Sequence, residues 1–250
     1  MITDPWFYAA AIPAVIVLGL SKGGFTALGL LMVPIMALAI SPVQAAGITL
    51  PILVFSDLVA LFSYRRIYDA TTLKIMIPGA MLGIAIGWLT ASFVTETEIR
   101  LIVGIISVIF AVQFFVRRGK DVPAAPQNVA KGTFWSAITG FTSFVSHAGG
   151  PPFQVYAAPL RLEPRLFAGT SVILFALVNA VKLVPYFFLG QFDTQNLATA
   201  AILLPISIPA TLLGVWLVKR FDPRAFYDLI YATICLVGIY LIVESIIDLA

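Results

Sequence analysis

Charged side chains are scarce in this sequence. Asp, Glu, Lys and Arg make up 11% of the 250 residues, whereas roughly a quarter of a soluble domain is charged. The mean hydropathy is +1.02, and apolar runs of about twenty residues with short polar connections leave no room for a sizeable soluble domain. A transmembrane barrel would show short alternating segments instead. The sequence therefore predicts an all-α polytopic membrane protein embedded in a lipid bilayer.

Cysteine and histidine are rarer still, with one of each, Cys235 and His147. They cannot supply a thiolate or imidazole cluster for a metal ion, and no pair of carboxylates stands at catalytic spacing. A phosphate-binding loop of the Walker type is also missing. We therefore expect no cofactor, no metal and no enzyme activity. The net charge of +3 comes from lysines and arginines in the connections, so it does not predict nucleic-acid binding.

Pro, Gly and charged residues interrupt the hydrophobic sequence and divide the chain into apolar segments. Six of them are long enough to span a bilayer: 43–64, 72–93, 98–116, 166–189, 196–218 and 225–247. Four shorter pieces flank two glycine-rich interruptions, namely 6–20, 26–40, 133–146 and 150–160. Each pair of short pieces is expected to enter the membrane as a broken hairpin.

The basic residues predict the orientation of these segments. Most of the 15 Lys and Arg fall in four connections: Arg65, Arg66 and Lys74; Arg117, Arg118, Lys120 and Lys131; Arg161 and Arg165; Lys219, Arg220 and Arg224. By the positive-inside rule these connections are cytoplasmic. Both termini then lie on the outer side, and segments 43–64 and 166–189 cross the membrane in opposite directions.

The two halves of the chain correspond to each other. Ser21-Lys22 aligns with Ser146-His147, and after one short gap Asp57 aligns with Asn179. Combined with the opposite orientations, this correspondence predicts two inverted structural repeats, each with a glycine-broken N-terminal helical hairpin followed by three transmembrane helices. Inverted repeats are frequent in transporters, which bind their substrates near the midplane.

The predicted boundaries follow from the basic stretch in the middle of the chain. Residues 1–118 form the first transmembrane repeat and residues 132–250 form the second. Residues 119–131 are expected to be a cytoplasmic linker, because they are polar and rich in lysine and proline.

The two glycine-rich turns carry the candidate binding residues. Backbone that leaves a helix at membrane depth must be buried in protein or line a wet cavity, and glycine lets a ligand approach it closely. The helix expected after each turn points its positive dipole end at the turn, which favours an anion. The predicted substrate-binding residues are Ser21, Lys22, Gly23, Gly24, Phe25 and Thr26 in the first turn, and Ser146, His147, Gly149, Gly150 and Gln154 in the second.

Lys22 and His147 have a structural alternative. Lys22 could extend to the membrane surface along its aliphatic stem, and His147 could be a packing residue. Their equivalent, glycine-flanked positions favour a functional role, since a lysine at this depth is costly unless it is paired or faces water.

Asp57 is the only acid well inside a spanning segment. Two roles stay open for it, a proton carrier or a counter-charge to Lys22. Asn179 keeps polarity at the equivalent position, and Lys182 follows three residues later on the same helical face. We predict that Asp57, Asn179 and Lys182 form a coupling or counter-charge group.

The segments "GLSKGGFTALGLLMVP" and "SHAGGPPFQVYAAP", on either side of a basic linker, resemble the TauE/SafE family of sulfite exporter-like permeases, also called the toluene-sulfonate uptake permease family. The resemblance covers essentially the whole chain. It implies a transporter for sulfite, sulfoacetate or a related organosulfonate in the bacterial cytoplasmic membrane. With the inverted repeats, we expect a secondary transporter that works by alternating access, with the anion between the two turns. Protons are a candidate coupling ion because of Asp57.

Two other functions stay open on the sequence. A passive anion channel would use the same midplane site. A membrane enzyme or assembly factor that handles a sulfur compound is a further alternative, and the missing catalytic clusters argue against it.

Overall fold

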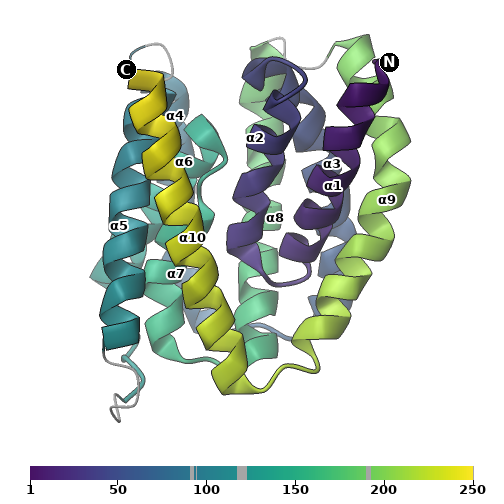
Figure 1. Ribbon diagram of the computed structural model, residues 1–250. Coiled ribbons are helices and arrows are strands. Elements are labelled where there is room, and N and C mark those ends of the chain that lie inside the picture. The colour runs from purple at the N-terminus through teal and green to yellow at the C-terminus, as the bar shows by residue number, and fades with distance from the viewer. Residues whose placement is uncertain (91–92, 94, 117–122, 190–192, 250) are drawn as a thin grey trace. The chain divides into compact units, whose positions relative to one another are not determined.

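A computed structural model of the chain describes residues 1–250 except 91–92, 94, 117–122, 190–192 and 250. Arg117, Arg118 and Lys120, in the basic connection at the middle of the chain, therefore lie outside the described residues. Over the described part, the chain is helical throughout and contains no strand (Figure 1), which confirms the all-α prediction. The elements are α1 (Pro5–Lys22), the 3₁₀ helix η1 (Thr26–Leu31), α2 (Met32–Ala37), α3 (Pro42–Tyr64), α4 (Ala70–Thr90), α5 (Glu96–Val116), α6 (Val129–Ser146), α7 (Gly150–Ala157), the 3₁₀ helix η2 (Ala158–Leu160), α8 (Pro164–Phe188), α9 (Thr194–Val218) and α10 (Pro223–Leu249).

Seven of the described helices are long and apolar enough to cross a membrane. Six of them, α3, α4, α5, α8, α9 and α10, correspond to the segments expected to span. The seventh is α1, whose predicted length was too short because the helix continues through Ser21 and Lys22 to reach 18 residues. Its start is fixed by Asp4, whose side chain accepts a hydrogen bond from the backbone N–H of Trp6 at 2.9 Å.

Helix α6 also begins earlier than expected, at Val129 instead of residue 133. Asn128 has extended backbone angles, and its side chain accepts a hydrogen bond from the N–H of Lys131 at 2.9 Å. Because this is the geometry of a helix N-cap, the last residues of the predicted linker belong to α6.

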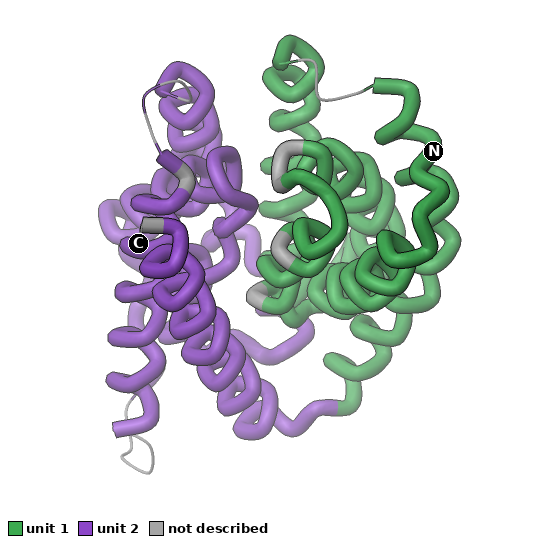
Figure 2. Tube along the Cα trace, turned by 45° about the horizontal axis from the view of Figure 1, so that its top comes forward, with its two compact units in different colours: residues 1–68, 168–220 green, residues 69–167, 221–250 purple. Residues whose placement is uncertain are grey.

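The chain forms two compact units (Figure 2). Unit 1 comprises residues 1–68 and 168–220, and therefore holds α1, η1, α2, α3, most of α8, and α9. Unit 2 comprises residues 69–167 and 221–250, and holds α4 to α7, η2 and α10. Each unit takes helices from both halves of the sequence, so the compact units are not the predicted repeats.

The order of the elements is similar in the two halves. Each has a long helix, a short broken segment and three long helices. In unit 1, α9 packs on α1. In unit 2, α4 packs on α6. In the predicted repeats α6 corresponds to α1 and α4 corresponds to α9, so the two contacts are equivalent. This similarity is compatible with the repeat, whose inverted relation stays a prediction.

In unit 1, α1 and α9 pack side by side (Figure 1), and their backbones approach closely at glycine residues. A Cβ atom on Gly214 would lie 2.7 Å from the carbonyl oxygen of Leu20 and 2.9 Å from the Cα of Gly23. A Cβ atom on Gly23 would overlap the backbone of Gly214. Small residues allow such close helix packing in membranes. This seam fixes the end of α1, where the first glycine-rich turn begins.

In unit 2, the end of the central linker is tied to two helices. The side-chain amide of Gln127 donates to Asp69 Oδ2 at 3.0 Å and to Thr72 Oγ1 at 2.9 Å, at the start of α4. The hydroxyl of Tyr156, on α7, donates to Gln127 Oε1 at 2.8 Å. The linker therefore ends in a hydrogen-bonded contact with the second broken hairpin.

Candidate functional site

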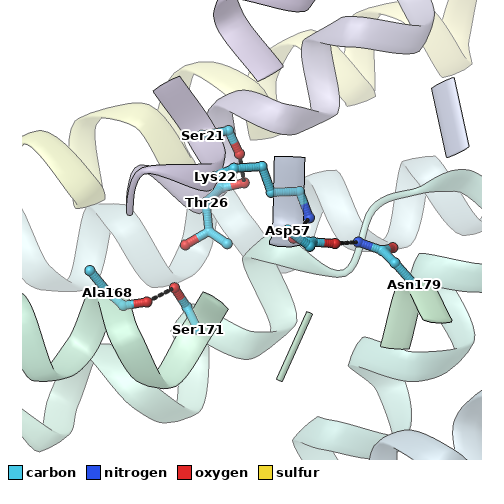
Figure 3. A network of polar contacts seen from close by, with 7 residues as sticks. All are labelled: Ser21, Lys22, Thr26, Asp57, Ala168, Ser171 and Asn179. Atoms are coloured by element: carbon cyan, nitrogen blue, oxygen red, sulfur yellow. Dashed lines mark hydrogen bonds and ion pairs between the residues drawn. The ribbon is translucent and has the colours of Figure 1, made fainter. Parts of the chain in front are cut away.

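A buried ion pair lies at the end of α1 in unit 1 (Figure 3). The ammonium nitrogen of Lys22 is 2.6 Å from Asp57 Oδ1, and the side-chain amide of Asn179 donates to Asp57 Oδ2 at 2.7 Å. Lys22 is 7% exposed, Asp57 2% and Asn179 3%. Asp57 and Asn179, which the sequence aligns as equivalent positions, thus touch each other directly. In this structure, Asp57 is the counter-charge of Lys22.

Lys182 belongs to the same group of charges. It is fully buried on α8, three residues after Asn179, and its ammonium nitrogen lies 5.5 Å from the centroid of the Tyr186 ring. It lies on the same helical face as Asn179, the residue that contacts Asp57. We call Lys22, Asp57, Asn179 and Lys182 the lysine cluster.

The first glycine-rich turn follows Lys22. Gly24 has φ +136°, a backbone angle that residues other than glycine rarely adopt. A Cβ atom there would also lie 2.7 Å from the Cβ of Ala168. The hydroxyl of Tyr64 donates to the carbonyl oxygen of Gly23 at 2.7 Å. The hydroxyl of Ser21 donates to the carbonyl oxygen of Thr26 at 3.2 Å. The turn is thus held by side-chain and backbone hydrogen bonds inside unit 1.

The source of positive charge at this turn differs from the prediction. The element that follows is the 3₁₀ helix η1, and the next α-helix, α2, has only six residues. The expected α-helix N-terminus is therefore not present at the first turn. Lys22 itself is the last residue of α1, where the helix dipole is negative and favours a cation. The positive charge here comes from lysine side chains.

Two hydroxyl groups of unit 1 are buried without a hydrogen-bond partner among the described residues. They are Thr26 Oγ1, at the first turn, and Ser56 Oγ, next to Asp57 on α3. Figure 3 shows Thr26 beside Ser21 and Lys22. A buried hydroxyl without a partner is costly, and it suits a place where a polar ligand completes the hydrogen bonds.

The second glycine-rich turn belongs to unit 2 and is built differently. His147, with φ 53°, is the left-handed residue that ends α6, and the N–H of Ala148 donates to the carbonyl oxygen of Thr142 at 3.1 Å. Gly149 has an ordinary φ of −74°. The expectation that glycine makes this turn is therefore wrong, since His147 does so. The hydroxyl of Ser146 donates to the carbonyl oxygen of Thr142 at 3.2 Å.

An α-helix does follow the second turn, as predicted. Helix α7 begins at Gly150, with Pro151 and Pro152 in its first turn, where a missing N–H costs nothing. Gln154 lies on this helix and is 1% exposed, yet neither its Nε2 nor its Oε1 has a hydrogen-bond partner among the described residues. Burying an amide in this way is unfavourable, so Gln154 is the strongest candidate ligand group of unit 2.

The candidate residues therefore fall in two places. The structure brings Lys22, Asp57 and Asn179 into contact within unit 1, where Ser21, Gly23, Gly24, Phe25, Thr26 and Lys182 also lie. The other candidates lie in unit 2: Ser146, His147, Gly149, Gly150 and Gln154.

Sequence reasoning missed three residues of unit 1. Ser56 could have been noticed as the neighbour of Asp57. Tyr64 lies 41 residues from the carbonyl group that it binds, and the ring of Phe175 has its centroid 6.0 Å from the Lys22 ammonium nitrogen. No local pattern marks these two contacts, because they depend on how α1, α3 and α8 pack. Within the described ranges, no group of three or more His, Cys, Asp or Glu side chains could hold a metal ion.

Comparison with known proteins gives one family. The family model described as sulfite exporter TauE/SafE matches residues 11–241 of the chain. The probable sulfite/organosulfonate exporter TauE of Cupriavidus necator is 26% identical over 149 residues, which cover 58% of this chain and 56% of that protein. The matched part thus spans little more than half of the relative's length. No solved structure matches the chain.

Proposed function

The chain belongs to the sulfite exporter TauE/SafE family, and on this premise we propose that it is a secondary transporter that moves a small sulfur-containing anion across the bacterial cytoplasmic membrane. The proposed substrates are sulfite, sulfoacetate and related organosulfonates. The name of the Cupriavidus necator relative supports this class of anion. The seven candidate spans support a multi-pass membrane protein.

The observation that carries the proposal is the buried ammonium group of Lys22 beside an unpartnered hydroxyl. Charges inside a membrane protein are costly and usually mark a functional site. Lys22 is 7% exposed and lies 2.6 Å from Asp57. At the turn that follows Lys22, the buried Thr26 hydroxyl has no hydrogen-bond partner among the described residues. A bound anion would accept a hydrogen bond from Thr26 and lie close to the ammonium group of Lys22.

We assign the sulfo-group oxygens of the substrate to the Lys22 ammonium group and the Thr26 hydroxyl. Ser21, Gly23, Gly24 and Phe25 shape the turn around them, since the Ser21 hydroxyl and the N–H groups of Gly23 and Gly24 donate to backbone carbonyl oxygens of unit 1. Unit 2 holds candidate anion contacts of its own, which are Gln154 and the turn residues Ser146, His147, Gly149 and Gly150. The unpartnered groups, Thr26 Oγ1 in unit 1 and the Gln154 amide in unit 2, are the most specific candidates of each unit.

Counterflow in proteoliposomes tests the proposal. Vesicles loaded with unlabelled sulfite, sulfoacetate or isethionate are diluted into a trace of the same anion in labelled form. A carrier exchanges the two, so we expect transient, saturable accumulation of label for at least one of the three anions. Empty liposomes are the control. A pH gradient imposed on the same vesicles shows whether transport also depends on protons, which would give Asp57 the role of a proton carrier.

Two outcomes would contradict the proposal. Absence of counterflow for every anion tested would remove the transport function. Conductance without counterflow or saturation would instead establish a passive channel.

Replacing Gln154 by leucine is expected to raise stability and to lower transport. Removing a buried amide without partners should stabilise the protein by about 1 kcal/mol, whereas the substrate would lose a contact. The measurements are the midpoint of thermal unfolding in detergent and the counterflow rate.

The matched control is Gln127→Leu in the same unit. It removes an amide that hydrogen-bonds Asp69, Thr72 and Tyr156, so it should lower the unfolding midpoint and leave counterflow intact. Unchanged counterflow in Gln154→Leu would show that the amide does not contact the substrate.

A further inference from the structure

We propose that Gln154 binds an anion through both atoms of its side-chain amide, so that the anion must carry a hydrogen-bond donor as well as its anionic oxygens. The inference rests on the proposed function and narrows its substrate class. Hydrogensulfite and alkanesulfonates with a hydroxyl or ammonium group belong to this class. Plain alkanesulfonates and sulfoacetate do not, because at neutral pH they offer only hydrogen-bond acceptors.

The Gln154 amide is enclosed by protein. Gln154 is 1% exposed, and every residue of α7 except Val155 is buried. Helix α7 packs against α5 and α6 within unit 2. Neither Oε1 nor Nε2 of Gln154 has a hydrogen-bond partner among the described residues. A buried amide in this situation requires both a donor, for its oxygen, and an acceptor, for its nitrogen.

The hydroxyl groups of the neighbouring helices already donate elsewhere. Five of them, on α5 and α6, donate to backbone carbonyl oxygens of their own helices, namely those of Ser107, Ser136, Thr139, Thr142 and Ser146. On α7, the hydroxyl of Tyr156 donates to Gln127 Oε1 at 2.8 Å. A hydroxyl group has one hydrogen, so none of these groups can donate to Gln154 Oε1 while it keeps its present bond. We therefore assign the missing donor to the ligand.

The start of α7 is poor in backbone donors. An α-helix normally offers the N–H groups of its first turn to an anion, but Pro151 and Pro152 have no N–H. The side-chain Nε2 of Gln154 is therefore the donor that we assign to the anionic oxygen. Rotation of the amide by 180° would exchange Oε1 and Nε2, and the requirement would be the same because both atoms lack a partner.

The two requirements together select the ligand. A sulfo-group oxygen accepts a hydrogen bond from Nε2, and a hydroxyl or ammonium group of the same anion donates to Oε1. An anion without a donor would satisfy Nε2 and leave Oε1 buried without a partner. A site built to hydrogen-bond a polar group of its ligand strongly rejects an analogue that lacks this group.

The test compares two anions of equal charge and similar size. Isethionate and 1-propanesulfonate differ only in a hydroxyl group that replaces a methyl group. Half-saturation concentrations for both are measured by counterflow at neutral pH. We expect the wild-type protein to prefer isethionate by at least about tenfold. Gln154→Leu removes the acceptor that needs the hydroxyl group, so the ratio should shift by at least about tenfold toward 1-propanesulfonate.

Gln113→Leu is the matched control. Gln113 is also in unit 2, but it is exposed on α5. The substitution makes the same chemical change without altering the Gln154 amide, and the preference for isethionate should stay at the wild-type value.

Several results would overturn the inference. Equal half-saturation concentrations in the wild-type protein or a preference for 1-propanesulfonate would do so, and so would an unchanged ratio in Gln154→Leu. If Gln154→Leu does not fold, Gln154→Met replaces it, because methionine is unbranched and similar in length to glutamine. If a variant transports too slowly, equilibrium binding of labelled isethionate in competition with 1-propanesulfonate gives the ratio. If neither variant folds, the wild-type ratio decides.

Failure of the proposed function would look different. Absence of counterflow for every anion would contradict transport itself. Saturable counterflow without a preference for isethionate would leave transport intact and contradict only the role of Gln154.

Discussion

Replacing Lys22 by methionine is expected to weaken substrate binding about a hundredfold and to destabilise the protein by about 3–5 kcal/mol. Both effects have the same origin, the loss of the ammonium group 2.6 Å from Asp57 Oδ1. The carboxylate would remain buried, with the Asn179 amide as its one remaining hydrogen-bond donor among the described residues. The substrate would lose the cation that we assign to its sulfo group.

The double variant Lys22→Met/Asp57→Leu separates these two effects. Replacing both members of a buried ion pair by apolar residues is often neutral or stabilising, so we expect stability to return to within about 1 kcal/mol of the wild type. Counterflow should stay as low as in Lys22→Met. The measurements are the unfolding midpoint in detergent and the half-saturation concentration for each anion. Recovery of transport together with stability would show that the ion pair is structural and that the anion binds elsewhere.

The second large effect is expected at the seam between α1 and α9. Gly23→Ala should destabilise the protein by about 2 kcal/mol or more, because its methyl group would overlap the backbone of Gly214 and backbone cannot rotate away. Since Gly23 directly follows Lys22, separation of the seam would also displace the lysine from Asp57. Thermal unfolding measures the first effect, and counterflow measures the second.

Gly87→Ala provides the matched control for the seam. The heavy atoms nearest to a Cβ atom on Gly87 would be side-chain atoms of Phe144, the first of them at 3.0 Å. A side chain can shift by a few tenths of an ångström, and alanine favours a helix more than glycine does. We therefore expect a smaller loss of stability than in Gly23→Ala. Equal losses in the two variants would mean that the backbone contact at the seam is not what makes Gly23 necessary.

The sequence was sufficient to predict the long helices. Apolar runs determine them directly, whereas the end of α1 at Lys22 and the start of α6 at Val129 were misjudged because local capping and helix continuation decide them. Asp57 and Lys22 were recognisable because charges are rare in such segments. Their pairing was one of two open roles, and the structure shows the contact.

The details of the two turns could not be predicted. A pair of glycines suggests irregular backbone, but it does not determine which residue takes the left-handed conformation, which is Gly24 in one turn and His147 in the other. The 3₁₀ helix after the first turn has no distinctive residue pattern. The hydrogen bond from Tyr64 to Gly23 joins two helices and depends on their packing. These features arise from tertiary contacts, which no local window of sequence contains.

The central claim is that the transported anion binds at Lys22. A crystal structure of the protein with selenite, the heavier analogue of sulfite, tests it most directly, because selenium can be located by its anomalous scattering. The account predicts a selenium peak with a selenite oxygen within about 4 Å of the Lys22 ammonium nitrogen, the distance of an ion pair. A selenium site remote from Lys22, with the contact between Lys22 and Asp57 intact, would contradict it.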